Sequence, residues 1–129
     1  MQYVVTQGAQ GICPTGSHVP SDNDWKILEV QLGMAQAQAD IGNAGWRGTD
    51  QGTQLKSGGT SGLNILLVGY HTPGTFTGLS SSTYLWSSSD AGGPAWDRYF
   101  VTGQAGVQRD SAPQECRHVG TMYKRLIKL

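Results

Sequence analysis

The sequence has few charged residues and no long apolar segment, and each shortage excludes a class of protein. No run is long and apolar enough to span a bilayer, and the start lacks the basic and apolar regions of a signal peptide. Nine basic and nine acidic residues give zero net charge, which removes the long-range attraction to phosphate that nucleic-acid binders use. We therefore expect neither membrane insertion nor a nucleic-acid partner.

Cysteine is too scarce for a disulfide scaffold, and no metal-site spacing is present. Cys13 and Cys116 are far apart in the sequence, so they either bridge the two ends of the fold or remain as two buried thiols. None of the three histidines has a partner at the spacing of metal ligands. The serines at 87–89 lack the Gly-x-Ser-x-Gly setting of a nucleophile. The sequence predicts no catalytic residue, no metal and no cofactor.

The sequence is rich in glycine and small polar residues, in contrast to its low content of charged residues. The chain has 19 glycines among 129 residues, a composition typical of a domain rich in turns. A chain of this length is sufficient for one domain with its own core. We expect a single domain over residues 1–129, in which residues 1–10 form a linker or an edge strand.

Two helices are predicted in the first third of the chain. Ser21 precedes a run of acidic residues, so its hydroxyl can accept a hydrogen bond from the first turn while the carboxylates face the positive end of the helix dipole. Apolar residues at helical spacing follow from Trp25, and Gly33 supplies a left-handed end. We expect an amphipathic helix from about Asp22 to Leu32 and a short second helix from Ala35 to Ile41.

A β-hairpin at residues 84–100 is the centre of the predicted fold. Two aromatic, strand-like runs flank a turn that contains two glycines and a proline. Because side chains alternate along a strand, Tyr84 and Trp86 share one face of the first arm, and Trp96 and Arg98 share one face of the second. We expect the hydrophobic core to pack against the face of the hairpin that carries these aromatic side chains.

Other segments are predicted around the hairpin. The apolar run at 65–68 is read as a buried strand, and further strands are expected at 105–109 and 121–129. Residues 45–62 are rich in glycine and are expected to form loops anchored by Trp46 and Leu55.

Short motifs with a distinctive combination of Trp, Arg, Ser and Gly occur along the chain. They are Gly11-Ile12-Cys13-Pro14-Thr15-Gly16-Ser17-His18-Val19-Pro20-Ser21-Asp22, Gly45-Trp46-Arg47-Gly48-Thr49-Asp50-Gln51-Gly52, Leu55-Lys56, Gly69-Tyr70, Tyr84-Leu85-Trp86-Ser87-Ser88-Ser89, Ala95-Trp96-Asp97-Arg98 and Val107-Gln108-Arg109. In this order they resemble the Fibrobacter succinogenes major paralogous domain. The resemblance implies a C-type-lectin-like α+β fold with two helices and a small twisted antiparallel sheet. It also implies a secreted or surface protein of Bacteroidetes-type bacteria or their phages, without known catalytic activity.

The chain departs from the pattern of this family at several positions. Ser17 stands where the family usually has tryptophan, Leu63 where it has phenylalanine, and His71 where it has arginine. The usual late cysteine corresponds to Leu126, so a disulfide like that of the family would need Cys116 as a substitute.

A second resemblance concerns the last third of the chain. Trp86, Ser87, Ser88, Ala95, Trp96, Arg98, Val107, Arg109 and Gly120 are similar to the fixed framework of variable proteins of diversity-generating retroelements. The resemblance implies that positions between them contact a ligand, namely Asp97, Tyr99, Phe100, Thr102, Gln104, Gln108, Asp110, Ser111 and His118. Tyr99 and Phe100 are adjacent in a strand, so one of them must point away from the core. The alternative is that both pack into a second small core.

The predicted function is non-enzymatic binding of a protein or carbohydrate ligand at a bacterial cell surface or on a virion. The structural framework is expected to consist of Trp25, Trp46, Trp86, Trp96, Arg98 and Arg109. The two arginines are expected to be buried or half-buried, to hold loop carbonyls and to stack on Trp86 or Trp96. One alternative is a structural repeat module of a surface or fibre protein without a ligand site. A weaker one is a degenerate relative of formylglycine-generating enzymes, which would need a reactive cysteine pair or a copper site.

Overall fold

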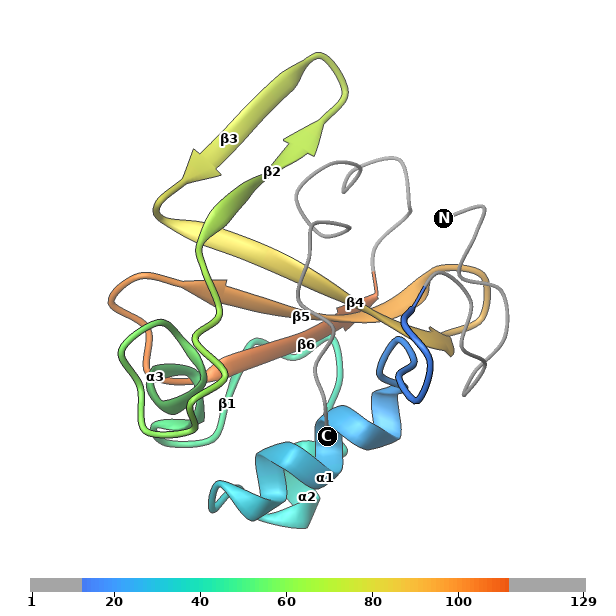
Figure 1. The fold of residues 1–129 in the computed structure, drawn as a ribbon, viewed down its shortest axis with the longest axis vertical. Helices are drawn as coiled ribbons and strands as arrows, with labels where there is room; N and C mark the ends of the chain where they lie inside the picture. The colour runs from blue at the N-terminus through green and yellow to red at the C-terminus, as the bar shows by residue number, and fades with distance from the viewer. Residues whose placement is uncertain (1–12, 112–129) are drawn as a thin grey trace.

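The computed structural model describes residues 13–111. Its elements are, in order, α1 (Asp22–Gln31), α2 (Gln36–Ala39), β1 (Trp46–Arg47), α3 (Gln51–Leu55), β2 (Val68–Thr72), β3 (Thr75–Leu79), β4 (Ser82–Asp90), β5 (Ala95–Val101) and β6 (Val107–Ser111). The strands form one sheet in the order β1-β6-β5-β4-β2-β3 (Figure 1). Neighbouring strands are antiparallel except β2 and β4, which are parallel.

The fold class predicted from the sequence is wrong. The prediction was a C-type-lectin-like α+β fold with two helices and a small antiparallel sheet. Residues 13–111 instead form mainly a six-stranded mixed sheet, with three short helices of 10, 4 and 5 residues. The mixed character arises because β4 returns past β3 and pairs with β2 through Gly69 and Thr83. Turn signals predict hairpins between consecutive strands, so they did not reveal this contact.

Helix α1 begins and ends much as the sequence predicts. The Ser21 hydroxyl accepts a hydrogen bond from the Asp24 backbone N–H at 3.1 Å, and the Asp24 carboxylate accepts one from the Ser21 N–H at 2.8 Å. This reciprocal pair is a capping box. At the other end Gly33 has φ 100°, and the N–H of Met34 donates to the carbonyl of Glu29, as in a Schellman motif.

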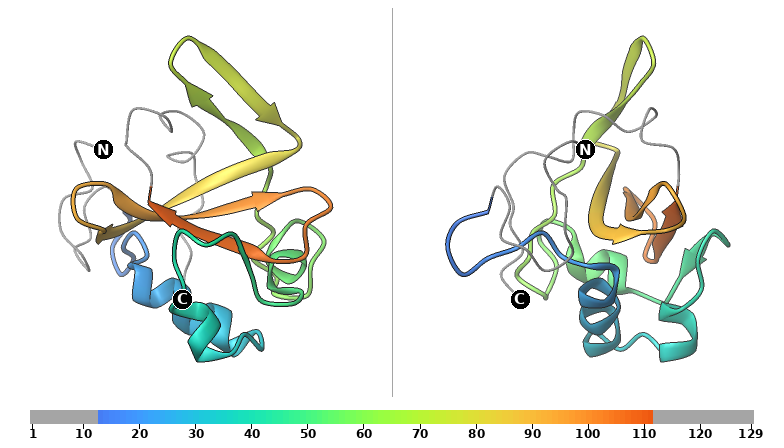
Figure 2. Two further views of the ribbon diagram at one scale, coloured as in Figure 1. Left: turned by 180° about the vertical axis from the view of Figure 1, so that it is seen from behind. Right: turned by 90° about the vertical axis from the view of Figure 1, so that its right-hand side faces the viewer.

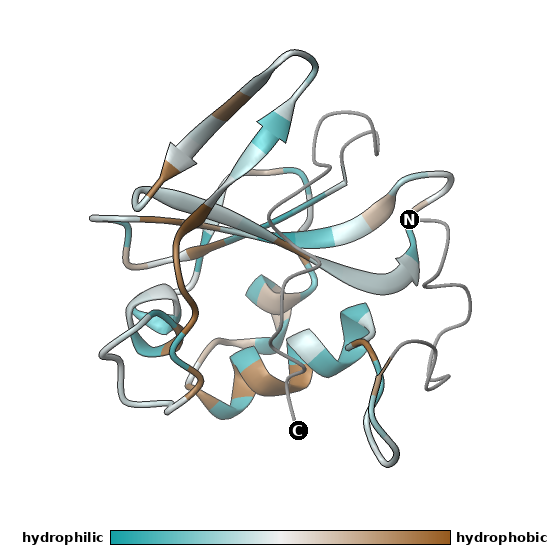
Figure 3. Ribbon diagram, turned by 45° about the horizontal axis from the view of Figure 1, so that its top comes forward, coloured by the Kyte–Doolittle hydropathy of each residue, from teal (hydrophilic) through white to brown (hydrophobic). Residues whose placement is uncertain are grey.

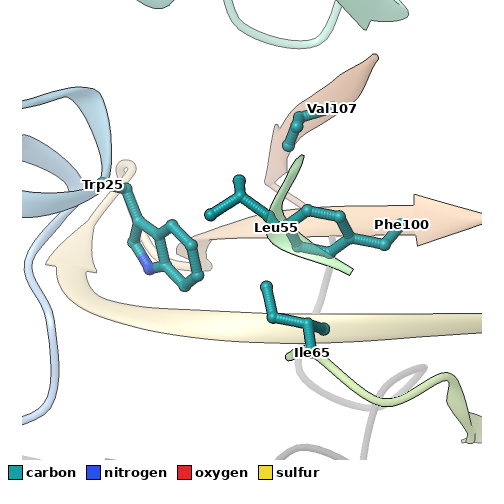
Figure 4. Close-up of a cluster of buried hydrophobic side chains, with 5 residues drawn as sticks. All are labelled: Trp25, Leu55, Ile65, Phe100 and Val107. Carbon is teal, nitrogen blue, oxygen red and sulfur yellow. The ribbon is translucent and has the colours of Figure 1, made fainter. Parts of the chain in front are cut away.

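The apolar core lies between α1 and one face of the sheet. Figure 4 shows Trp25 of α1 pointing toward Phe100 of β5, with Leu55 of α3, Ile65 and Val107 of β6 around them. All five side chains are buried, and burying a side chain of this size contributes about 1.5–3 kcal/mol to stability. Leu28, Leu32, Leu63, Leu67 and Leu85 pack against this cluster. Helices α1 and α2 lie on this side of the sheet (Figure 2), which we call the inner face.

Several expected elements differ from the structure or lie outside it. Helix α2 is shorter than the predicted range 35–41, and α3 occupies part of the region expected to be looped. In the apolar run 65–68, Ile65 is buried but Leu66 is 52% exposed, and β2 begins only at Val68. The predicted edge strand within residues 1–10 and the predicted strand 121–129 lie outside the described residues.

Strands β2 and β3 form a hairpin that projects away from the rest of the domain (Figures 1 and 2). Its turn joins Thr72 to Thr75, as the sequence predicts. Phe76 and Leu79 on β3 are 48% and 68% exposed, and Figure 3 shows brown, apolar segments on β3 within a hairpin that is otherwise largely hydrophilic or neutral. Within residues 13–111, no helix combines the length and apolar character needed to cross a membrane.

Candidate functional site

The register of the central hairpin distributes its side chains between the two faces of the sheet. The predicted hairpin is present, with Leu85 opposite Arg98 and Trp86 opposite Asp97. Because side chains alternate along each strand, Leu85 and Arg98 lie on the inner face, while Trp86 and Asp97 lie on the opposite side, which we call the outer face. Trp96 is two residues before Arg98 and therefore also lies on the inner face. The two tryptophans of the hairpin, Trp86 and Trp96, thus point to opposite sides of the sheet.

Three arginines on the inner face hold two carboxylates of α1. Arg98 donates from Nη1 to Asp22 Oδ1 at 2.8 Å and from Nε to Glu29 Oε1 at 2.6 Å. Arg109 donates to both carboxylate oxygens of Asp22 at 2.8 Å, and Arg47 donates to both oxygens of Glu29 at 3.1 and 2.9 Å. All five residues are buried. Strands β5, β6 and β1 are therefore tied to one helix by charge-assisted hydrogen bonds.

The electrostatics of this network favour the ionised form of Asp22. Burial by itself raises the pKa of Asp22, but the hydrogen bonds and positive charges of Arg109 and Arg98 outweigh it and lower the pKa from 3.8 to about 2. Arg109 also lies over the Trp96 ring, 3.6 Å from its centroid. The sequence predicted this stacking, but it predicted loop carbonyls as the main partners. The structure adds the two carboxylates and a third arginine, Arg47.

On the outer face, aromatic side chains from four strands form a continuous row. The Trp46 ring stacks on Tyr99 with centroids 5.8 Å apart, and Tyr99 stacks on Tyr84 at 4.1 Å. Tyr70 contacts Tyr84 and Tyr99 edge-on at 5.0 and 6.4 Å. We call these four residues the aromatic row. Trp46, at the end of the row, is 39% exposed, so part of a large ring is accessible at the edge of the sheet.

Strand β6 adds two polar side chains beside the aromatic row. Gln108 is paired in register with both Trp46 and Tyr99, so it lies between their strands. Asp110 is the next outward-facing residue along β6, opposite Asp97. Burial raises the pKa of Asp110, and the positive charge of Arg47 offsets only part of that effect. The ionised form of its carboxylate is therefore less favourable than that of an exposed aspartate.

Two of the predicted ligand-contacting residues are inaccessible. Phe100 is fully buried in the inner core against Trp25. Asp97 is on the outer face but is also fully buried. The prediction that one of the adjacent pair Tyr99 and Phe100 points away from the core is confirmed, because Tyr99 joins the aromatic row. Phe100 and Asp97 must be removed from the candidate surface, since a ligand cannot reach their side chains.

The remaining predicted positions lie in four different places. Thr102 and Gln104 are exposed in the turn between β5 and β6. Gln108 and Asp110 are half-buried on the outer face, whereas Ser111 lies at the end of β6, where its N–H donates to the Asn43 side chain at 2.8 Å. His118 lies outside the described residues. The structure therefore brings Tyr99, Gln108 and Asp110 together and leaves the turn residues beyond them.

Sequence reasoning missed part of this surface. Trp46 was assigned to the framework, and Tyr70 and Tyr84 were given no role on the ligand-contacting surface. The alternation of Tyr84 with Trp86 was visible in the sequence, but the neighbours of Tyr84 across the sheet were not. Only the strand order places Trp46 of β1 and Tyr70 of β2 in one row with it.

The other polar residues examined in the sequence have structural contacts. His18 Nε2 lies 3.1 Å from Asp24 Oδ2, and the hydroxyls of Ser87 and Ser88 donate to the carbonyls of Trp96 and Val19 at 2.7 and 3.2 Å. Among residues 13–111, no group of three or more His, Cys, Asp or Glu side chains is arranged to hold a metal ion. Cys13 is buried, and Cys116 lies outside the described part of the chain.

Comparison with known proteins establishes the family. A family model described as the Fibrobacter succinogenes major domain matches residues 2–128. No curated protein matches the chain, and no solved structure matches it. The family match extends over nearly the whole sequence and confirms the resemblance seen in its motifs. The chain therefore belongs to the Fibrobacter succinogenes major domain family.

Proposed function

We propose that this domain is a non-enzymatic binding module whose outer face, over β1, β5 and β6, contacts a protein or carbohydrate ligand. The supporting observation is the aromatic row, which ends at the accessible ring of Trp46. Stacked rings lose little conformational entropy when a ligand covers them. Gln108 and Asp110 stand beside the row and offer hydrogen-bonding groups, so apolar contact and polar specificity are available within one patch.

The inner face supports this proposal because its contacts do not involve the accessible outward residues. The buried ion pairs and the core cluster join α1 to the strands on the inner face. Trp86 and Asp97 are buried on the outer face as well, but Trp46, Gln108 and Asp110 are exposed or half-buried there, so their side chains can differ in chemistry without loss of the inner contacts. This is the property required of a surface that recognises ligands.

The test compares two exposed aromatic residues on different parts of the molecule. Trp46→Ala and Trp46→Ala/Gln108→Ala remove the accessible end of the aromatic row, and Phe76→Ala on the projecting hairpin is the matched control. Each protein is applied to a panel of immobilised oligosaccharides and to a phage-displayed peptide library. We expect the wild type and Phe76→Ala to select the same binders and the Trp46 variants to lose them. Retention of all binders by the double variant would contradict the proposal.

We further propose that the module acts at a bacterial cell surface or on a virion and that its outward positions are those that change among variable relatives. The support is the alternation along β6, where Val107 and Arg109 are buried and Gln108 and Asp110 are half-buried, together with the half-buried Tyr99 of β5. A reverse-transcriptase gene beside this gene, with a near-repeat of its 3′ end, is the expected observation. A neighbourhood without either would contradict the variable-protein part of the proposal.

The alternative function, a structural repeat module, has its own supporting observation. The β2–β3 hairpin projects from the domain and exposes Phe76 and Leu79 on the outermost strand of the described sheet. An apolar edge of this kind can pair with a neighbouring domain. Light scattering of the purified chain over a range of concentrations tests it: self-association lost in Phe76→Lys favours the structural role, and a concentration-independent monomer opposes it.

A further inference from the structure

We propose that the ligand is a protein that presents a cationic side chain, an arginine or a lysine, to Asp110 beside the aromatic row. This inference rests on the proposed function and specifies the chemistry of the partner. It follows from three observations, which are the distribution of charge between the two faces, the lack of a hydrogen-bond donor or ion pair for Asp110 among residues 13–111, and the position of the rings beside it.

The charges of the sheet are separated by face. Arg47, Arg98 and Arg109 are the only arginines or lysines in the strands of residues 13–111, and all three point to the inner face, where they bind carboxylates of α1. The outward side chains of β6 are Gln108 and Asp110. No arginine or lysine of the described strands therefore points to the outer face beside Asp110, and a positively charged partner complements this carboxylate.

Asp110 differs from most other carboxylates of the described chain. Asp22 and Glu29 are paired with arginines, Asp40 with Lys26, and the side chain of Asp90 accepts from the backbone of the turn that follows it. No residue between 13 and 111 donates a hydrogen bond or forms an ion pair with Asp110, although it is half-buried. A half-buried carboxylate without a donor loses hydration, and the positive charge of Arg47 offsets only part of that loss for Asp110. A guanidinium or ammonium group would supply the missing donors.

The aromatic row adds a second attraction for the same group. Asp110 follows Gln108 by two positions, about 7 Å along the strand, and Gln108 lies between the strands of Trp46 and Tyr99. The faces of Tyr99 are covered by stacking on Trp46 and Tyr84, so a ring face that can attract positive charge is available at the end of the row, on the partly exposed Trp46. Arginine suits both contacts, because its planar group can stack on a ring while it pairs with a carboxylate. A neutral sugar could stack on the rings but would leave the carboxylate charge uncompensated.

The experiment is an NMR titration of the full chain with two matched tripeptides, Gly-Arg-Gly and Gly-citrulline-Gly, which differ in charge but hardly in shape. We expect the arginine peptide to shift the indole N–H signal of Trp46 and the side-chain amide of Gln108, and the citrulline peptide to bind at least fivefold more weakly. The Asp110→Asn substitution should lower the affinity for the arginine peptide by at least fivefold. The control Asp50→Asn, at the exposed carboxylate that immediately precedes α3, should leave the affinity unchanged.

Each other outcome has a defined meaning. Equal binding of both peptides, or an Asp110→Asn variant as strong as Asp50→Asn, overturns the inference. If cello-oligosaccharides shift the Trp46 and Gln108 signals and the arginine peptide does not, the proposed function stands and the cationic partner is wrong. If no probe and no selected binder affects these signals, the proposed function fails as well. The last outcome concerns the chain's own basic residues Arg117, Lys124, Arg125 and Lys128. If neutralising them increases the affinity for the arginine peptide tenfold, this basic segment itself occupies the site beside Asp110, which also overturns the inference.

Discussion

Arg98 and Tyr99 are neighbours in β5, yet they belong to two faces with opposite chemistry. On the inner face, charges are buried and paired, and Arg98 contacts two carboxylates at 2.6 and 2.8 Å. On the outer face, rings stack on one another, and Asp110 receives no hydrogen bond from residues 13–111. The comparison shows that alternation places the arginine network on one face and the aromatic row with Gln108 and Asp110 on the other, although Trp86 and Asp97 of the outer face are buried as well.

The largest effect is expected from the inner ion pairs. Arg98→Ala leaves two buried carboxylates with fewer partners, and breaking such a pair costs about 3–5 kcal/mol. Asp40→Ala is the control, because it removes an exposed carboxylate that pairs with Lys26 and leaves the contacts of Asp22 in place, and an exposed pair contributes about 1 kcal/mol or less. Urea unfolding of the two variants measures the difference. Similar losses in both would mean that the inner network does not stabilise the domain more than a surface pair does.

A second pair of variants compares adjacent residues on the two faces. Phe100→Ala opens a cavity in the core cluster and should reduce the free energy of unfolding by about 3–4 kcal/mol. Tyr99→Ala removes ring stacking on the outer face and should cost about 1–2 kcal/mol. Thermal and urea unfolding of each variant give the comparison. A larger loss for Tyr99→Ala would reverse the assignment of core and surface.

Lowering the pH should change the stability contributions of Asp22 on the inner face and Asp110 on the outer face in opposite directions. The pKa of Asp22 is about 2 in the folded protein, below its ordinary value of 3.8, so its contribution is complete above that ordinary value and lost as pH falls toward 2. The shift corresponds to about 2 kcal/mol. Asp110 has a raised pKa, so its ionisation opposes folding as pH rises.

The measurement is urea unfolding of the wild type, Asp22→Asn and Asp110→Asn between pH 2 and pH 7. Asp22→Asn should show a weaker loss of stability in acid than the wild type. Asp110→Asn should gain stability over the wild type as pH rises from 3 to 7. If the free energy of unfolding of both variants had the same pH dependence, the two faces would not differ in their electrostatics as described.

The smallest effect on stability is expected at the edge of the outer face. Trp46→Ala removes one stacked ring that is already 39% exposed, and the expected loss is about 1 kcal/mol. The same variant should lose the binders selected by the wild type in the ligand screen. Differential scanning calorimetry gives the stability. A loss above about 3 kcal/mol would indicate that Trp46 belongs to the framework, as the sequence first suggested.

The sequence predicted the family and several local features correctly. The start of α1, its end at Gly33, the turn after Thr72 and the central hairpin all depend on residues within a few positions of one another. Caps and turns are local in this sense, so composition and spacing are sufficient to find them. The fold class was wrong because the parallel pairing of β2 with β4 and the helix α3 have no comparable local signal.

By itself, then, the sequence determined the alternation of side chains in each strand and the position of the capped helix. Only the tertiary structure decided which residues meet. The hydrogen bonds from Arg98 to Glu29 and from Arg109 to Asp22 span 69 and 87 residues, and the aromatic row combines four strands. Such contacts depend on strand order and register, because the physical proximity of two side chains across a sheet is set by neighbours that are remote in the sequence.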